Sequence, residues 1–403
     1  MRIPLILAFL LPALQVAIDT YLFFIAQRRH KSSGLARFQL YESVFFLIYV
    51  IVLFFLPARS GVSEGGLLIV MWMVYFYIMV YAAKLAYVVF DLLASLPAVW
   101  GKKRLRLLNR AGVAIGAVIV ATMLWASFIN RFRIQVNELA INIDNLPASF
   151  DGYRIAQISD LHLGTFGTNT DFAAKLVEKV NSMKPDMVVF TGDIVNQRAS
   201  EAEQFISVLA GLEARDGVFS ILGNHDYGDY VRWNSDNDRE QNLERIMDQQ
   251  IEMGWELLTN SSEIIYSPEG NDSIVIVGVE NWGDPPFKQL GDIDTAYPTS
   301  GDSAVKILLT HNPRHWTDIV APTDSMRYAL TLSGHTHAMQ FRVGPLSPAS
   351  LRYPDCWAGL YSTPDGRKLY VNTGAGCVGI PMRIGATPEI TLFTLRQSNN
   401  RKN

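Results

Sequence analysis

Two histidines, His335 and His337, follow an apolar, strand-like run in the segment LTLSGHTHAMQ, residues 330–340. Imidazole is a common metal ligand, and it also transfers protons near neutral pH. A single His-x-His pair also occurs as two hydrogen-bonding loop residues. The pair therefore predicts a metal site only if other strand-like segments end in similar side chains.

Four other apolar runs end in the same way. YRIAQISDLHLG ends at Asp160 and His162, PDMVVFTGDIVN at Asp193, GVFSILGNHDYG at Asn224 and His225, and AVKILLTHNP at His311. Five of the seven histidines lie at these ends, while His30 and His315 lie elsewhere. Because strand ends converge at one edge of a layered α/β sheet, we expect these side chains to meet. Gly192, Gly223 and Gly334 precede candidate ligands and would let the backbone turn sharply there.

Mixed carboxylate and imidazole ligands suit Mn, Fe, Zn or Ni better than a calcium site built only of oxygen. Seven donors exceed the needs of one ion. With one shared aspartate they suit two ions about 3.5–4 Å apart, which activate a water molecule and hold both oxygens of an in-line displacement at phosphorus. The pattern therefore predicts two divalent ions and phosphoester hydrolysis.

The ordered set D-x-H, G-D, G-N-H-D, H and G-H-x-H resembles the calcineurin-like metallophosphoesterase superfamily, over roughly residues 150–395. The resemblance implies a two-sheet β-sandwich flanked by helices, with a dinuclear centre at the strand ends. Carried over by position, the first metal takes Asp160, His162 and His337, the second takes Asn224, His311 and His335, and Asp193 bridges them. His225 would then assist the leaving group, with Asp226 as the acidic neighbour that orients it. His315 is the rival of His311, and we interpret it as a surface or core histidine.

A closer resemblance, to a bacterial and partly membrane-attached subgroup, rests on SDLHLG, GNHD, GHTH and a closing NTGAG…PEITLFTL. Some members of that subgroup cleave lipid-linked or nucleotide-linked pyrophosphates. Their GHTH is commonly followed by Gly-Gly-Gln, whereas this chain has Ala338-Met339-Gln340. The change adds side chains beside the predicted metal site, so it leaves the shape of the substrate pocket open.

Two further segments are candidates for shaping the substrate site. Residues 227–238 would form a lid, and residues 348–362 would dip toward a bilayer; ordinary packed loops are the alternative for both. Arg232, Arg342 and Arg352 are candidates for binding the substrate phosphate. The two cysteines, Cys356 and Cys377, are either a disulfide or two buried thiols.

The first third of the chain is of another kind. Residues 3–27, 38–57, 67–93 and 111–129 are apolar runs of bilayer-spanning length. A cleaved signal peptide and buried soluble helices are the alternatives for the first run. We expect a transmembrane region over 1–133, a phosphoesterase domain over 134–396, and a polar tail over 397–403.

Loop charges predict the orientation of these spans. The stretches 28–37 and 101–110 are strongly basic, and 58–66 carries one charge of each sign. The positive-inside rule places both basic stretches in the cytoplasm of a bacterial inner membrane and the catalytic domain outside it. Arg131 and Arg133, just after the fourth span, are discordant.

Polar and small residues within the spans predict how the helices pack. Asp19 and Lys84 fall at similar depth, which favours a structural ion pair over a transport pathway. We expect Asp91 to be interfacial, and Gly112 and Gly116 to form a GxxxG packing motif.

We therefore expect a membrane-embedded phosphoesterase acting on a phosphate ester or pyrophosphate that is lipid-linked. The sequence has no basic-aromatic stripe of the kind that binds nucleic acid. The alternative is a metal-binding sensory or scaffold protein that keeps the fold without turnover. A missing ligand or the loss of His225 would favour that alternative, and all are present.

Overall fold

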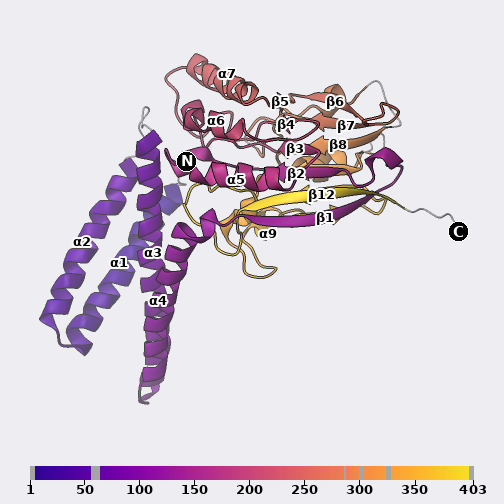
Figure 1. The fold of residues 1–403 in the computed structure, drawn as a ribbon. Helices are drawn as coiled ribbons and strands as arrows, with labels where there is room; N and C mark the ends of the chain where they lie inside the picture. The colour runs from indigo at the N-terminus through magenta and orange to yellow at the C-terminus, as the bar shows by residue number, and fades with distance from the viewer. Residues whose placement is uncertain (1–4, 56–63, 286, 299–303, 324–327, 399–403) are drawn as a thin grey trace. The chain divides into compact units, whose positions relative to one another are not determined.

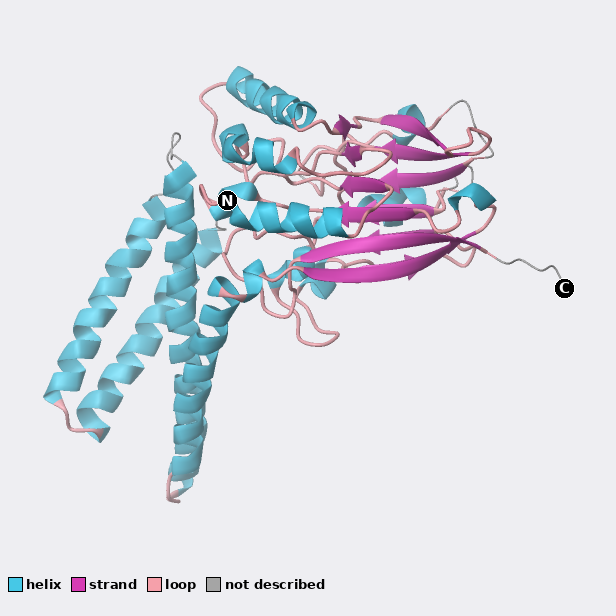
Figure 2. Ribbon diagram, viewed as in Figure 1, coloured by secondary structure: helices cyan, strands magenta, loops and turns pink. Residues whose placement is uncertain are grey.

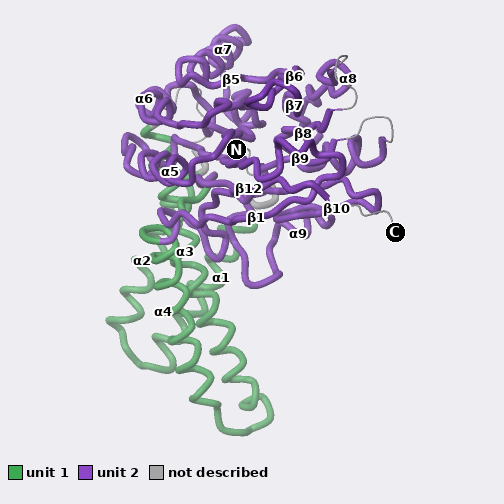
Figure 3. Tube along the Cα trace, turned by 45° about the vertical axis from the view of Figure 1, so that its right-hand side comes forward, with its two compact units in different colours: residues 1–129, 379–381 green, residues 130–378, 382–403 purple. Residues whose placement is uncertain are grey.

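The computed structural model describes residues 5–55, 64–285, 287–298, 304–323 and 328–398 (Figure 1). These residues form two compact units, one of residues 1–129 with 379–381 and the other of residues 130–378 with 382–403 (Figure 3).

The first unit consists of long apolar helices: α1 (Leu5–Phe24), α2 (Ser33–Phe55), α3 (Glu64–Ser95) and α4 (Arg106–Phe128). All four are long and apolar enough to cross a membrane. The predicted spans fall on these helices, and their residues 3, 4, 56 and 57 lie outside the described residues.

The GxxxG prediction is confirmed, because α4 packs closely on α3 at both glycines. A Cβ atom at Gly112 would lie 2.7 Å from Phe90 Cβ, and one at Gly116 would lie 3.2 Å from the Ala83 carbonyl oxygen. Only a residue without a side chain lets the two backbones approach this far.

The predicted ion pair between Asp19 and Lys84 is also confirmed, with 2.7 Å between Lys84 Nζ and Asp19 Oδ1. Lys84 also contacts Glu42 at 2.5 Å, and the Tyr81 hydroxyl donates to Asp19. These partners satisfy the charges inside the apolar helices.

Asp91, which we expected to be interfacial, lies near the end of α3 among polar partners. Asp91 is fully buried and accepts hydrogen bonds from Arg29 and Arg104, as well as from Tyr21 and Asn109. The sequence showed the aspartate near a helix end, but it did not show that arginines from two separate basic stretches meet there.

The second unit contains two six-stranded sheets, drawn in magenta in Figure 2. The first sheet has the order β1-β12-β2-β3-β4-β5 and the second has the order β10-β11-β9-β8-β7-β6. The strands of the first sheet are β1 (Gln135–Ile143), β12 (Glu389–Gln397), β2 (Arg154–Ile158), β3 (Met187–Phe190), β4 (Val218–Ser220) and β5 (Glu256–Leu257). The strands of the second are β10 (Gly359–Ser362), β11 (Lys368–Val371), β9 (Leu330–Ser333), β8 (Val305–Leu309), β7 (Ser273–Gly278) and β6 (Ser261–Tyr266).

The two sheets pack face to face, and helices cover their outer faces (Figure 1). The core between the sheets joins Ile155 and Val189 of the first sheet to Ile276 and Ile307 of the second. Alternate residues of the same strands point outward, as side chains in a strand do, and there they meet helices. The predicted sandwich flanked by helices is therefore confirmed.

The helices of this unit are α5 (Asp171–Ser182), α6 (Ile206–Leu209), α7 (Asp236–Glu252), α8 (Ile293–Ala296) and α9 (Ala349–Arg352). The amphipathic residues 171–182 form α5. Residues 199–205 form only short 3₁₀ turns before α6, and α7 begins at Asp236. The reason is the cap at Ser235, whose side chain accepts a hydrogen bond from the Asp238 backbone N–H.

Parallel pairing brings the loops that carry the candidate ligands to one edge of the sandwich. The strands β2, β3 and β4 run parallel in the first sheet, and β7, β8 and β9 run parallel in the second. Each candidate ligand follows the carboxyl end of one of these strands.

Candidate metal centre

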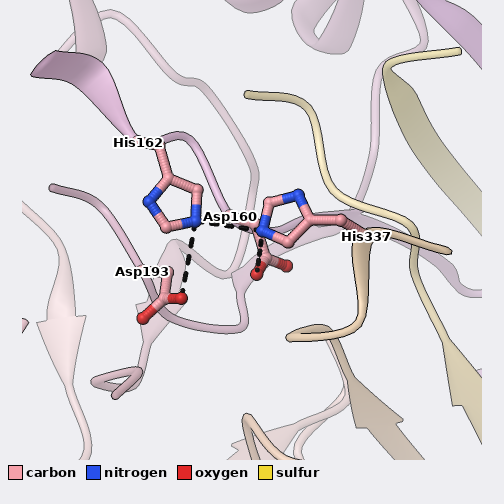
Figure 4. A group of neighbouring side chains, drawn as sticks. All are labelled: Asp160, His162, Asp193 and His337. Atoms are coloured by element: carbon pink, nitrogen blue, oxygen red, sulfur yellow. Dashed lines mark hydrogen bonds and ion pairs between the residues drawn. The ribbon is translucent and has the colours of Figure 1, made fainter. Parts of the chain in front are cut away.

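Seven predicted ligands meet at the carboxyl ends of the strands, in two groups that share Asp193. The first group joins Asp160, His162, Asp193 and His337 (Figure 4), and the second joins Asp193, His311 and His335. The side-chain oxygen of Asn224 adds to the second group, at 3.1 Å from His311 Nε2 and 2.7 Å from His335 Nδ1.

The donor atoms face one another at short range. His162 Nε2 and His337 Nε2 are 3.0 Å apart, and His337 Nε2 is 3.1 Å from an oxygen of Asp160. Asp193 Oδ2 lies 3.2 Å from His311 Nε2 and 3.5 Å from His162 Nε2. One carboxylate oxygen thus faces a histidine of each group.

The protonation of two of these rings fits a divalent metal. The far nitrogens of His162 and His311 donate to the backbone carbonyls of Val195 and Thr191, at 3.2 and 2.7 Å. Each Nε2 therefore faces the carboxylate of Asp193. Burial lowers the pKa of His162 well below its usual value, so the ring is neutral and its lone pair faces that carboxylate; the two repel unless a cation lies between them. At His311, whose pKa is raised, a proton takes the place that a metal ion would occupy, so the residues present fit metal ions.

The carboxylates around His311 favour a positive charge beside Asp193. Burial lowers the pKa of His311, but Asp193 and then Asp160 more than offset it and raise that pKa to about 9. Burial also opposes ionisation of Asp193, yet His311 and His225 hold its pKa well below the usual value. His335 behaves oppositely, because burial and His311 lower its pKa to about 4.

Five of the ligands have a left-handed backbone conformation that non-glycine residues rarely adopt. The φ angles are 54° at Asp160, 45° at His162, 62° at Asp193, 74° at His335 and 50° at His337. Each such residue costs about 1–2 kcal/mol relative to the right-handed form. Hydrogen bonds from the surrounding loops must hold this strain.

Glycines serve the site in two ways, and only one of them was predicted. Gly192 has φ +92° and makes the sharp turn before Asp193. Gly223 and Gly334 do not have positive φ; instead, a Cβ atom there would collide with Asp193 and with Ser159, respectively. Their role is close approach of the backbone rather than a turn.

Asp226 organises the loops rather than His225. Its two oxygens accept hydrogen bonds from the backbone N–H groups of Gly223, Asp193, Ile194 and Val195, at 2.8 to 3.3 Å. Burial and the charge of Asp193 raise its pKa to about 7, against the N–H donors, which favour the ionised form. The carboxylate therefore ties the loop after β3 to the loop after β4.

The Asn196 carbonyl orients His225 instead, since it lies 2.6 Å from His225 Nδ1. The backbone N–H of His225 donates to Asp193 at 2.8 Å, and the ring stacks on Tyr230 with centroids 4.3 Å apart. The expectation that Asp226 orients His225 is corrected, because a backbone carbonyl from another loop takes that position.

The structure adds two supporting residues that the sequence analysis did not identify. His335 Nε2 lies 2.8 Å from the Tyr353 hydroxyl, which donates to Asp284. Arg383 is fully buried, lies 3.0 Å from His337 Nδ1, and also donates to three backbone carbonyls. Tyr353 lies in the segment 348–362 that was a candidate for shaping the substrate site, though no role at the metal ligands was expected of it. Arg383 has no motif, so no pattern in the sequence marks it.

The arginines proposed for phosphate binding do not join the metal ligands. Arg352 pairs with Asp284 at 2.8 Å, and Arg342 donates to the Gly344 carbonyl and lies over the Trp357 ring. Arg232 is exposed. Among the residues the structure describes, no hydrogen bond or ion pair connects any of the three to a candidate ligand.

Three other sequence expectations are decided by the structure. Cys356 and Cys377 are buried free thiols. His315 is a core histidine that contacts Thr310 and stacks on Trp282. Ala338 and Met339, which replace two glycines of the related motif, have φ 49° and 46°, so they take a conformation that glycine would adopt without strain.

Comparison with known proteins gives consistent matches to phosphoesterases. The model of the calcineurin-like phosphoesterase family matches residues 153–339. The chain is 30% identical to a "Transmembrane protein with metallophosphoesterase domain" of Danio rerio, over 66% of this chain and 58% of that protein. It is also 30% identical to the "Uncharacterized metallophosphoesterase YkuE" of Bacillus subtilis (strain 168), over 68% of this chain and 90% of that protein. The "UDP-2,3-diacylglucosamine pyrophosphatase LpxG" of Chlamydia trachomatis is likewise 30% identical, over 69% of this chain and 94% of that protein.

Proposed function

The chain belongs to the calcineurin-like phosphoesterase family, and from this premise we propose that it is a membrane-embedded hydrolase with two divalent metal ions and a lipid-linked phosphate ester or pyrophosphate as substrate. The observation that carries the proposal is the pair of donor groups that share Asp193.

In this proposal Asp160, His162 and His337 hold one ion, Asn224, His311 and His335 hold the other, and Asp193 binds both. The donor set suits Mn, Fe or Zn. When bound, such ions lower the pKa of a water molecule and withdraw charge from the phosphoryl oxygens.

The part played by His225 follows from its hydrogen bonds. Its Nδ1–H donates to Asn196, so in the protonated imidazolium form its Nε2–H is the group that gives a proton to the leaving oxygen and leaves the ring neutral. Tyr230 stacks on the ring and, together with Asn196, keeps it from rotating. Asp226 supports this arrangement indirectly, by fixing the two loops that carry Asp193 and Asn224.

A lipid-linked substrate is supported by an exposed apolar surface in the phosphoesterase unit. Met339, Phe341, Val343, Leu346, Leu351 and Leu360 are all exposed, and we call them the 339–360 surface. Leu351 is 89% and Leu346 71% exposed. Exposing such apolar side chains is unfavourable in water and favourable against lipid. This segment directly follows the ligand His337, and the name of the Chlamydia relative includes a diacylated substrate.

The orientation we propose rests on Asp91 and on the direction of α4. Arg29 and Arg104 both bond Asp91, so the two basic stretches lie at the same end of the four-helix unit. By the positive-inside rule that end is cytoplasmic. Helix α4 begins at this end and runs to the opposite end of the unit. The residues after Phe128 would therefore lie on the extracytoplasmic side of the bacterial inner membrane.

The discordant charge of Arg131 has a local explanation. Its guanidinium lies 4.4 Å from the centroid of the Phe132 ring, and the residue is buried. It packs as part of the phosphoesterase unit and does not behave as a loop charge at the membrane surface.

The test is hydrolysis by the full-length, manganese-loaded protein in detergent. Bis-p-nitrophenyl phosphate, p-nitrophenyl phosphate and a panel of lipid phosphates and diphosphates would be compared, with Asp193→Ala as the blank. We expect turnover above the blank and a preference for a lipid compound. A double variant, Leu346→Asp with Leu351→Asp, should reduce turnover of lipid in vesicles but not of p-nitrophenyl phosphate. Equal loss on both compounds would refute the role of the 339–360 surface.

A further inference from the structure

His335 faces the second group of donors through a different ring nitrogen from His311. His311 turns its Nε2 toward this group, whereas His335 turns its Nδ1 toward the Asn224 oxygen, 2.7 Å away. The far nitrogen of His311 donates to the Thr191 carbonyl, but that of His335 lies 2.8 Å from the Tyr353 hydroxyl. Because a ring nitrogen binds a metal only when it carries no proton, the group at the far nitrogen decides whether Nδ1 of His335 is available.

The Tyr353 hydroxyl selects the tautomer of His335 that can bind a metal through Nδ1. The hydroxyl has one proton, which it donates to Asp284 Oδ2 at 3.2 Å, and an ionised carboxylate accepts hydrogen bonds but donates none. Toward His335 the hydroxyl oxygen therefore presents a lone pair, so Nε2 of the ring carries the proton. The lone pair of the neutral ring is then on Nδ1, the nitrogen that faces the second group.

Asp284 can hold this hydroxyl because its own carboxylate is fixed on several sides. Arg352 donates to Oδ2 at 2.8 Å, and the Asn312 side chain donates to Oδ1 at 3.1 Å. Arg314 Nε lies 3.6 Å from the same Oδ1. Since Asn312 directly follows the ligand His311, the carboxylate of Asp284 is connected to both histidines of the second group.

A second tyrosine orients the amide of Asn224. The Asn224 Nδ2 group donates to the Tyr230 hydroxyl at 2.6 Å, and the amide oxygen then faces His311 and His335. An amide binds a metal ion through its oxygen, because the NH₂ group is a hydrogen-bond donor without a free lone pair. If the side chain turned by half a rotation, the NH₂ group would face the two histidines and could not bind an ion. Tyr230 therefore selects the ligand atom of Asn224, as Tyr353 selects that of His335.

The first group of ligands is oriented by other contacts. His162 donates to the Val195 carbonyl at 3.2 Å, and Arg383 lies 3.0 Å from His337 Nδ1. Neither contact involves a tyrosine hydroxyl. Loss of the two hydroxyls should therefore affect the two groups unequally.

We propose that the hydroxyls of Tyr230 and Tyr353, the second of them held by Asp284, position the ligands of the second ion alone. Neither residue touches the reacting atoms in this role; both are positioning residues. The inference rests on the proposed function, because it assumes that the second group binds an ion. It gives the segments 227–238 and 348–362 a task at the metal centre in addition to any contact with substrate.

The experiment is a Co²⁺ titration of full-length protein that has been stripped of metal, in detergent, followed by visible absorption. We expect two binding steps in the wild-type protein. Tyr353→Phe and Tyr230→Phe should each weaken one and the same step by about 10–100-fold, the usual effect of losing a group that orients a metal ligand. The other step should stay unchanged. Phenylalanine at position 230 can still stack on His225, so that variant removes only the hydroxyl.

Two further variants separate a local effect from a general one. Tyr153→Phe is the matched control, because the buried Tyr153 also donates its hydroxyl to an aspartate, Asp216, at 2.6 Å. Tyr153 lies at the opposite end of β2 from Asp160, so both Co²⁺ steps should match the wild type. His311→Ala leaves only the first group with all its ligands, and adding Tyr353→Phe to that variant should not alter the step that remains.

Equal weakening of both steps in the Tyr230 and Tyr353 variants would overturn the inference, because it would show a general loss of structure. Two unchanged steps would overturn it as well. Wild-type protein that binds a single Co²⁺ ion would overturn both this inference and the two-ion proposal. Failure of the proposed function alone gives a different result: if one step weakens selectively but no ester is hydrolysed, the positioning role stands and the enzymatic proposal falls.

Discussion

Replacing Asp226 by asparagine tests whether this residue holds the metal-binding loops together. Its Oδ2 accepts from the backbone N–H groups of Asp193 and Gly223, and its Oδ1 accepts from those of Ile194 and Val195. In Asp226→Asn an NH₂ group takes the place of one oxygen and faces two N–H donors. Each buried donor left without an acceptor costs about 1–3 kcal/mol, so the variant should lose roughly 2–6 kcal/mol of stability.

The assay is thermal unfolding of the full-length protein in detergent, together with metal analysis. For a domain of this size 1 kcal/mol corresponds to about 2–4 °C, so Tm should fall by roughly 4–24 °C. Metal content should fall as well, because the displaced loops carry Asp193 and Asn224. Asp151→Asn is the matched control, since Asp151 is exposed and accepts one backbone N–H, from Gln397; its Tm should change by less than about 2 °C.

A variant with wild-type Tm and full metal content would refute the reasoning. It would show that the four hydrogen bonds of Asp226 do not maintain the loops. If Tm and metal content were unchanged but turnover fell, Asp226 would act on His225 after all.

The remaining predictions concern four other residues. Asp193→Ala should lose both metal ions, because one carboxylate serves the two groups; elemental analysis that finds one ion retained would contradict the sharing. His225→Ala should keep its metals but lower turnover by about 10²–10⁴-fold, the usual contribution of a general acid; loss of metal would refute the assigned role. Burial lowers the pKa of His315 to about 4. Between pH 6.5 and 4 the unfolded chain therefore binds a proton at this histidine while the folded protein does not. The free energy of unfolding should fall with falling pH by up to roughly 3 kcal/mol. His315→Phe, which can still stack on Trp282, should remove that slope in pH-dependent unfolding of metal-free protein, and parallel curves for the two proteins would count against it. Met339→Gly should raise stability by up to about 1 kcal/mol, since Met339 has φ 46°; Lys175→Gly within α5 should instead lower it by about 1 kcal/mol, and a Met339→Gly loss of the same sign would show that the conformation is not strained.

The sequence determined the class of fold and the identity of the candidate ligands. Asp160, His162 and the others follow apolar strands in a set order, and chemistry restricts which side chains can bind such metals. Apolar runs of about 20 residues likewise indicate the four helices that could cross a membrane, because bilayer thickness sets the length such helices need. The pairing of Asp19 with Lys84 could be anticipated, since both are ionisable residues at similar depth.

Only the tertiary structure decided how these residues are supported. Asn196 orients His225 in place of Asp226, which holds the loops instead, because hydrogen bonds between loops depend on backbone positions that no local pattern records. Arg383 reaches His337 from a segment without a motif, and Asp91 gathers arginines from two distant stretches. Local periodicity and ligand chemistry can be predicted from the order of residues, whereas contacts between distant loops depend on how the folded chain packs.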